Sequence, residues 1–527
     1  MVSAGPLELC RCGKSTNSAP MILELGRLAV VLAGLMAGWS VISSALAFRT
    51  GRSDLAETAW RGLVAATCCA ALALVILIGA FVAGDVSVQF VAAQWSVITP
   101  LRYLATALLS APGGALLAWA ALGGLMGIVV IRSLRAEGAT LRARTAAAMA
   151  VGGILGVPLV VVGAALSPLA PHAAAMDGLG LSPDLQSGPA TIVAVTLCIG
   201  LAAGSAPVVA TIAALAGHRI DAAWSRRLHV SAALATAALV LALAASARWH
   251  ALHPMRGPWL RDPATMAWLV PAAVAGWMVW LGSRAPTAER TVMRVLLAIA
   301  LFVTGVSALA LGGAAFVRGV TIAPGTPVAI WLAVLPVAAI AATIALVRHG
   351  GGALRGTVAP PHHRPHRAGR MVSVAGMVLI AGAAGGGYFA REHTVTLADA
   401  EIFRTRDPFG GQWSFASQGI STLRRDNFAS LTVSLLPTRN ETRLPVVNVE
   451  ARSYLLADGS DAAPPTFVSG SRTSPMMELR VAMIRADGEH PTVRVSFVPL
   501  AGWLVAGAGM LAAGILLNVI PHPRRTQ

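Results

Sequence analysis

Residues 248–268 concentrate positive charge, aromatic rings and imidazoles in one short stretch. Its candidate binding residues are Arg248, Trp249, His250, His253, Arg256, Trp259, Arg261, Asp262 and Trp268. Aromatic rings beside positive charge suit a flat amphipathic ligand that carries carboxylates. His250 and His253 would both reach one metal if they were helical, but Pro254 breaks a helix there, and solvated loop histidines are the commoner case. We therefore expect a ligand-binding stretch and assign no metal site to it.

Two simpler interpretations of this stretch stay open. Tryptophan gathers at membrane–water interfaces for positional reasons, and arginines in a short loop can meet lipid phosphates. Both interpretations require residues 248–268 to lie at a membrane surface. The elements on either side of the stretch therefore decide what it can do.

The composition predicts a polytopic membrane protein. Of the 527 residues, 56% are hydrophobic and only 12% are charged, and the mean hydropathy is +0.70. A soluble chain of this length would need far more polar residues to cover its surface, and a disordered chain would be far less apolar. The net charge of +17 comes almost entirely from arginine, because Lys14 is the only lysine. Arginines in cytoplasmic loops explain this charge better than nucleic-acid binding does.

Apolar runs of about 20 residues predict the membrane-spanning helices. We find eleven, at 22–47, 59–84, 102–131, 145–167, 189–216, 228–247, 264–283, 291–313, 326–347, 370–389 and 499–520. Arginines cluster in alternate loops, which predicts an outer N-terminus and a cytoplasmic C-terminus in a bacterial inner membrane. The loops at 85–101, 168–188 and 248–263 are then expected outside, and the second of them contains His172.

Residues 390–498 are polar enough to fold outside the membrane. Apolar and polar residues alternate at 394–397, 431–435 and 493–497, and Gly, Pro and Asp separate these runs. The predicted fold is therefore an all-α polytopic membrane protein with a small antiparallel extracytoplasmic β domain between its last two helices. Its expected parts are a helical domain of about ten spans at 21–389, the β domain at 390–498, the last span at 499–520 and a cytoplasmic tail at 521–527.

The placement of reactive side chains argues against three kinds of function. The five cysteines form no C-x-x-C pair, so the chain is not a c-type cytochrome. None of the twelve histidines falls at the middle of a predicted span, which disfavours a haem held within the membrane. The span centres also lack Asp, Glu, Lys and Arg, which disfavours a proton or ion transporter. His172, His250 and His253 remain as outer candidates.

Short motifs follow one another along the chain in a recognisable order. They are MILELG at 21–26, AFVAGDVSV at 80–88, GLGLSPDLQ at 178–186, GHRID at 217–221, AFVRGV at 315–320 and EARSY at 450–454. In this order they resemble the CcmF/NrfE family, the haem-handling subunit of bacterial cytochrome c maturation. The resemblance covers about residues 21–520, so residues 1–20 are expected to be an N-terminal extension or to follow a misassigned start codon.

This resemblance implies a membrane subunit similar to the haem–apocytochrome c ligase. In the family, haem is held under a tryptophan-rich segment while cysteine thiols of the apocytochrome add to its vinyl groups. The implied cofactor is a transiently bound b-type haem. The implied partners are apocytochrome c, haem-chaperone and thiol-reductase subunits and the lipid membrane, with no nucleic acid. Here the tryptophan-rich segment is reduced to Trp249, Trp259, Asp262 and Trp268.

The chain departs from the family at the expected haem ligands. The positions of the family's four histidines fall at Val193 and near Gly325, Gly276 and Val374, none of which can ligate iron. Any haem would therefore have to be held by His250, His253 or His172, with its propionates on Arg248, Arg256 or Arg261.

The missing histidines keep other functions open, and the sequence assigns no catalytic residue. One alternative is a non-catalytic scaffold of the maturation complex that has lost the haem ligands. A third possibility, a small-solute or lipid permease, lacks any polar pathway through the spans.

Overall fold

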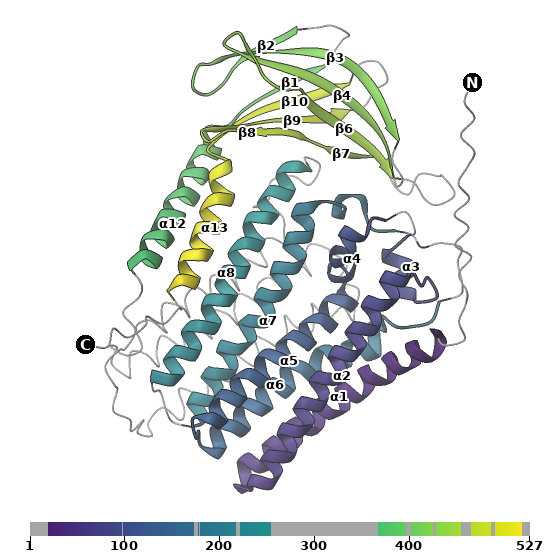
Figure 1. Ribbon diagram of the computed structural model, residues 1–527, viewed down its shortest axis with the longest axis vertical. Helices are drawn as coiled ribbons and strands as arrows, with labels where there is room; N and C mark the ends of the chain where they lie inside the picture. Colours follow the sequence, from purple (N-terminus) through teal and green to yellow (C-terminus); the bar gives the residue numbers. More distant parts are fainter. Residues whose placement is uncertain are drawn as a thin grey trace, which may run out of the picture.

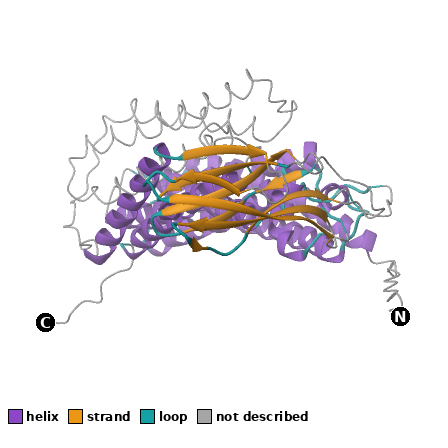
Figure 2. Ribbon diagram, turned by 90° about the horizontal axis from the view of Figure 1, so that it is seen from above, coloured by secondary structure: helices purple, strands orange, loops and turns teal. Residues whose placement is uncertain are grey.

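A helical bundle and a β domain that lies across one end of it make up the structure (Figure 1). The computed structural model describes residues 19–96, 99–172, 178, 180–217, 222–253, 367–396, 402–424, 428–454, 465–485 and 491–518. Seen from above, the strands cover the helices beneath them (Figure 2). The end of the bundle under the strands is called the β-facing end below.

Long apolar helices build the bundle. The α-helices are α1 (Ala19–Thr50), α2 (Ser53–Ala83), α3 (Gln89–Gln94), α4 (Leu104–Ser110), α5 (Pro112–Ala136), α6 (Leu141–Val161), α7 (Gly188–Ala216), α8 (Ala222–Leu252), α12 (Arg367–Tyr388) and α13 (Gly502–Leu517). Short helical turns lie between some of these helices, at Leu101–Tyr103, Val162–Leu166 and Pro183–Leu185. Within the described residues, six helices are long and apolar enough to cross a membrane, namely α1, α2, α5, α6, α7 and α8.

Two of the predicted spans do not have the same bounds as the helices that the structure contains. The run at 102–131 is divided into α4 and α5, because Ala111 is extended and Pro112 begins the second helix. The run at 228–247 is shorter than α8, which continues through Arg248, Trp249 and His250 to Leu252. The predicted spans at 264–283, 291–313 and 326–347 lie outside the described residues.

The β domain consists of two antiparallel sheets. Its strands are β1 (Arg391–Thr396), β2 (Ile402–Arg406), β3 (Gln412–Arg424), β4 (Phe428–Arg439), β5 (Thr442–Arg443), β6 (Val447–Tyr454), β7 (Thr466–Val468), β8 (Gly470–Thr473), β9 (Met477–Arg485) and β10 (Thr492–Pro499). The strand order is β1-β10-β9-β8 in one sheet and β2-β3-β4-β6-β7 in the other, where β5 also pairs with β4. The predicted alternating runs lie within or overlap β1, β4 and β10.

One apolar core joins the two sheets. Trp413 and Phe415 of β3 contribute to it from one sheet, and Val493, Val495 and Phe497 of β10 contribute from the other. Every second residue of β10 is buried, which is why the apolar and polar residues of that strand alternate. The domain is therefore a sandwich whose interior is closed by its own side chains.

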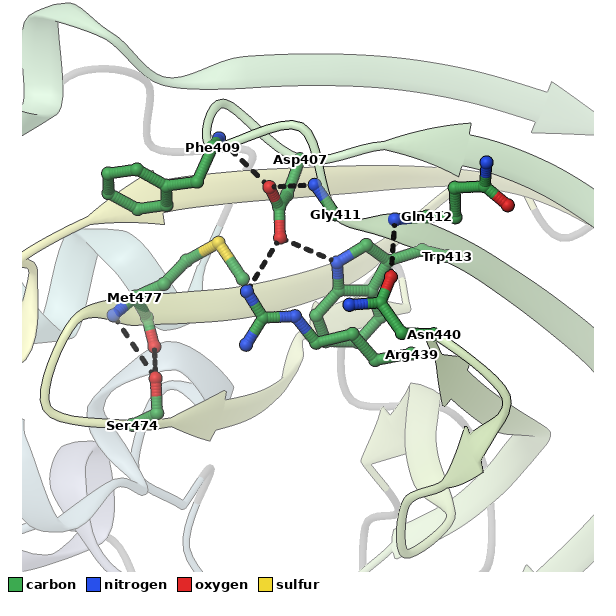
Figure 3. A network of polar contacts seen from close by, with 9 residues as sticks. All are labelled: Asp407, Phe409, Gly411, Gln412, Trp413, Arg439, Asn440, Ser474 and Met477. Atoms are coloured by element: carbon green, nitrogen blue, oxygen red, sulfur yellow. Dashed lines mark hydrogen bonds and ion pairs between the residues drawn. The ribbon is translucent and has the colours of Figure 1, made fainter.

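A buried carboxylate holds the turn between β2 and β3. Asp407 accepts hydrogen bonds from the backbone N–H groups of Phe409 and Gly411, each at 2.9 Å, and from the Trp413 indole at 3.0 Å. The Arg439 guanidinium also donates to Asp407, at 3.0 Å (Figure 3). Burial acts to raise the pKa of Asp407, but these donors outweigh it and hold the pKa below its ordinary value.

Glycine allows α12 and α13 to cross at close range. A Cβ on Gly376 would lie 2.5 Å from the backbone nitrogen of Leu511 and 2.7 Å from the carbonyl oxygen of Gly507. Neither backbone atom can rotate away as a side chain could. The hairpin of α12 and α13, which carries the β domain between its two helices, therefore depends on a missing side chain at this crossing.

We expect Gly376→Ala to destabilise the protein by about 1–3 kcal/mol, because the new methyl group meets backbone rather than a movable side chain. Gly509→Ala on α13 is the matched control, since no described atom lies within 4 Å of its added Cβ. The measurement is the thermal unfolding midpoint of each full-length variant in detergent. Equal midpoints for the two variants would contradict the close helix crossing.

We expect the stability contributed by Asp407 to be complete above about pH 4 and to be lost as the pH falls through the lowered pKa of the folded carboxyl. Asp407→Asn should remove most of this contribution at neutral pH, about 1–3 kcal/mol, because an amide cannot accept all four hydrogen bonds. The unfolding midpoint between pH 3 and pH 7 measures both effects. Asp54→Asn, at an exposed ion pair with Arg52, should change it little, and an equal loss in both variants would rule out the network's role.

Candidate functional site

Three chain segments meet at the β-facing end of the bundle. The loop after α2 pairs with the loop after α6, because Val88 and Pro171 form a β-bridge and the backbone N–H of His172 donates to the Ser87 carbonyl at 2.6 Å. The third segment is the end of α8, which packs beside α7. Two of these segments contain motifs that carry the family resemblance, at 80–88 and 178–186.

Trp249 connects the end of α8 to the loop before α7. Its indole N–H donates to the carbonyl oxygen of Asp184 at 2.8 Å, and its side chain is buried. The Trp249 ring also lies edge-on to both histidines, 5.9 Å from His250 and 6.3 Å from His253 between ring centroids. An interface anchor would leave its ring toward lipid, so this tryptophan instead forms part of an interior cluster.

Both candidate histidines are buried and held in one orientation. The Nδ1 atom of His250 lies 2.9 Å from the Ser246 carbonyl oxygen, and Nδ1 of His253 lies 2.9 Å from the Trp249 carbonyl oxygen. Because a carbonyl can only accept a hydrogen bond, the Nδ1 atom of each ring carries a proton. Nε2 is then the nitrogen of each ring with a lone pair for a metal or a hydrogen-bond donor. These histidines are therefore not the solvated loop residues of the simpler interpretation.

Arg248 does not face solvent as an unpaired charge. It forms an ion pair with Glu478 of β9 and donates to the Ser471 hydroxyl of β8 at 2.8 Å. Glu478 is only 2% exposed and also pairs with Arg480 at 3.2 Å. Burial opposes ionisation of Glu478, but the guanidinium groups of Arg480 and Arg248 hold its pKa below the ordinary value. Two arginines and one carboxylate leave a net positive charge at this junction.

A cavity opens beside this ion-pair cluster. It has a volume of about 210 Å³ and is lined by Arg248, Glu478, Arg480 and the first turn of α13. Small-molecule sites are commonly about 300–1,000 Å³, so the cavity can receive a carboxylate-sized group or the edge of a larger ligand. The backbone N–H of Ser469 donates to the Leu252 carbonyl at 3.1 Å, which ties the last turn of α8 to the sandwich.

The predicted site residues divide into three groups. Arg248, Trp249, His250 and His253 lie together at the end of α8. His172 is exposed in the neighbouring loop and pairs through its backbone with Ser87. The other predicted residues, Arg256, Trp259, Arg261, Asp262 and Trp268, lie outside the described residues.

Two positions where the resemblance expects histidine can be located. Val193 is buried in α7 and is 3% exposed. Val374 lies on α12 and is 54% exposed. Gly276 and Gly325 lie outside the described residues. The side chains at the two located positions are apolar, so neither can act as a ligand for iron.

Two features of the β domain meet the bundle although they were not predicted site residues: Glu478 pairs with Arg248, and Tyr454 of the strand at 450–454 interacts with Tyr103. Arg452 pairs with Glu450 at 2.6 Å, and its guanidinium lies 4.6 Å from the centre of the Phe428 ring. Burial raises the pKa of Tyr454, which Arg452 partly opposes, and the phenol of Tyr103 at the bundle end raises it further. The motif resemblance marked this strand, whereas no local sequence signal distinguishes Glu478 from other acidic residues in β strands.

Known proteins resemble this chain in sequence over part of its length, although no protein-family model matches it. It is 33% identical over 302 residues to the cytochrome c-type biogenesis protein CcmF of Pseudomonas aeruginosa. It is 27% identical over 293 residues to the cytochrome c-type biogenesis protein ccl1 of Rhodobacter capsulatus. Each match covers 54% of this chain but only 43% and 44% of these relatives, respectively, which is less than half of their length.

The fold is similar to a solved structure over nearly the whole chain. Cytochrome c haem lyase CcmF superposes with a TM-score of 0.70, and the match covers 98% of this chain and 99% of that one. The two sequences are 17% identical, so this likeness concerns the fold alone.

We expect Arg248→Gln to loosen the contact between α8 and the β domain, because it leaves the buried Glu478 carboxylate with Arg480 alone. The expected loss is about 1–3 kcal/mol. Arg494→Gln is the matched control, since Arg494 pairs with an exposed Glu392 at 3.8 Å and such pairs contribute less than about 1 kcal/mol. Thermal unfolding and limited proteolysis of the β domain measure the effect. A loss no larger than that of the control would contradict the junction.

Proposed function

We propose that this chain, a member of the CcmF family, acts in the membrane during cytochrome c maturation, where it brings haem and apocytochrome c together. The observation that carries this proposal is the buried cluster of Trp249, His250 and His253 directly below the β domain. Family membership supplies the biological process, and the cluster supplies a place for the reaction. The attachment of haem to apocytochrome thiols is the activity that we infer for that place.

The described residues contain suitable donors for a haem, but the cavity of about 210 Å³ beside Arg248 is too small for the whole ring. His250 or His253 would supply Nε2 to the iron, because Nδ1 of each is already committed to a backbone carbonyl. Arg248 lines the cavity and would meet a propionate, in competition with Glu478. Trp249 would limit the movement of an imidazole, since its ring contacts both histidines.

The contribution of the protein to the reaction would be positioning. The chemistry that a bound haem would supply is the addition of apocytochrome cysteine thiols to its vinyl groups. Fixed imidazoles and a fixed arginine restrict how a ligand can lie, and a β domain above them restricts how a peptide can approach. Such proximity converts an encounter between two partners into a reaction within one complex. We assign no proton transfer to any residue of the chain.

The proposed orientation places the β-facing end and the β domain outside the bacterial inner membrane. The opposite bundle end carries Arg49, Arg52, Arg135 and Arg142, which favours a cytoplasmic position. Apocytochrome c would then approach from the outer side, together with the haem-chaperone and thiol-reductase subunits implied by the family. Haem would be a b-type, transient ligand in this arrangement.

A second candidate is a non-catalytic scaffold of the maturation complex. Two observations favour it. Val193 and Val374 stand where the resemblance expects histidine, and the Arg248 charge is already paired with Glu478. In this role the same surface would bind apocytochrome c or another maturation subunit, while a separate protein holds haem.

The Soret absorption of the purified protein distinguishes these candidates. We expect full-length protein from haem-replete cells to show a Soret band that is reduced at least several-fold in His250→Ala or His253→Ala. His393→Ala, at a histidine of β1 away from the cluster, is the matched control and should keep the band. A folded wild-type protein without a band, which still co-purifies with maturation subunits, would contradict the haem site and support the scaffold.

A further inference from the structure

A second cavity lies at the bundle end opposite the β domain. It has a volume of about 150 Å³ and lies between α2, α5 and α6. Ile131, Leu141 and Ala148 form apolar walls, while Glu57, Trp60, Arg135 and Arg144 give it a polar side. The cavity belongs to neither the proposed haem site nor the ion-pair junction under the β domain.

This bundle end has an excess of positive charge. In the described parts of α1, α2, α5, α6 and α8 at this end, and the short connections between them, nine arginines stand against three acidic residues. The arginines are Arg49, Arg52, Arg61, Arg132, Arg135, Arg142, Arg144, Arg226 and Arg227, and the acids are Asp54, Glu57 and Glu137. Each of the three acids already pairs with at least one arginine. Several guanidinium groups are therefore left without a carboxylate among the described residues, and a negative group from outside the chain could pair with them.

Among these arginines, Arg144 is the one that lines the cavity without an ion-pair partner among the described residues. Among the described residues its guanidinium has no ion pair, and its Nε is buried without a hydrogen-bond partner. A buried N–H donor without a partner lowers the stability of the folded protein by about 1–3 kcal/mol, so an acceptor that binds at this atom would be stabilising. Arg135, which also lines the cavity, pairs with Glu57 and lies 5.1 Å from the centre of the Trp60 ring. The Glu57 carboxylate offsets Arg135, which leaves the charge of Arg144 in excess.

We propose that this cavity binds the phosphate group of an anionic phospholipid, with Arg144 as its principal partner. Arginine presents N–H donors in a fork that matches phosphate oxygens. The cavity lies at the ends of apolar helices, where a headgroup would enter from the bilayer while its acyl chains remain along the helices. Trp60 supplies the aromatic ring that commonly marks the headgroup level. Basic pockets between helices are a known way for proteins to bind acidic lipid headgroups.

The test measures lipid binding to delipidated full-length protein by native mass spectrometry. The probes are phosphatidylglycerol, zwitterionic phosphatidylcholine and inorganic phosphate. We expect wild-type protein to retain phosphatidylglycerol in preference to phosphatidylcholine. Arg144→Gln should weaken phosphatidylglycerol binding about five-fold, the effect of one basic residue at a lipid surface.

Arg49→Gln is the matched control, because Arg49 is exposed at the same end and does not line the cavity. It removes the same charge and should weaken binding less than two-fold. Equal losses in Arg144→Gln and Arg49→Gln would overturn the proposal, since they would indicate general surface charge. No preference for phosphatidylglycerol in the wild-type protein would also overturn it, whether or not Arg144→Gln folds. Displacement of the lipid by inorganic phosphate at equal concentration would assign the site to free phosphate instead.

Discussion

The buried Glu478 carboxylate joins the two parts of this protein. It belongs to β9 of the sandwich, yet one of its two partners is Arg248 of α8. A carboxylate that is 2% exposed is stable in the charged form only while guanidinium groups surround it. The position of the β domain over the helices is therefore set by charge as well as by the apolar contact of α8 with α13. The backbone hydrogen bond from Ser469 to Leu252 then fixes the height of the sandwich above the last turn of α8.

The same junction shapes the proposed haem site. Arg248 precedes Trp249 and His250 in the chain, so the ion pair that holds Arg248 also limits the rotation of this helix end. The hydrogen bonds from Nδ1 of both histidines to helix carbonyls complete that restraint. A ligand entering here would meet side chains that are already oriented, which reduces the entropy lost on binding. A scaffold would benefit equally from such rigidity, and for this reason the choice between the two functions depends on haem itself.

Arginine serves different purposes at the two ends of the bundle. At the β-facing end, Arg248 and Arg480 compensate the buried charge of Glu478, and Arg248 thereby links α8 to the β domain. At the opposite end, the described acids are fewer than the described arginines, and Arg144 lies beside a cavity among the helix ends. The first arrangement stabilises the fold, whereas the second suits a ligand from the bilayer. A net charge of +17 does not distinguish them, because it adds both ends together.

Much of the architecture could be predicted from local patterns. Long apolar runs predicted α1, α2, α6, α7 and α8, since a helix satisfies its own backbone hydrogen bonds wherever a bilayer or an apolar core surrounds it. Alternating residues predicted β1, β4 and β10 for an equally local reason. Motif order also indicated a resemblance to one family through the segments at 80–88, 178–186 and 450–454. The break before Pro112 and the extension of α8 to Leu252 were missed, because apolar composition does not mark a helix end.

Local sequence patterns predicted the candidate site only in part. Residue types alone determined that Trp249, His250 and His253 could bind a ligand, and that Arg248 could attract an anion. Only the tertiary structure decided that the tryptophan bonds to Asp184, that both imidazoles are buried, and that Arg248 is paired with an acid 230 residues away. The physical reason is that a side chain's type determines which partners it can accept, while the partner it obtains depends on which distant segments the fold brings within hydrogen-bonding distance.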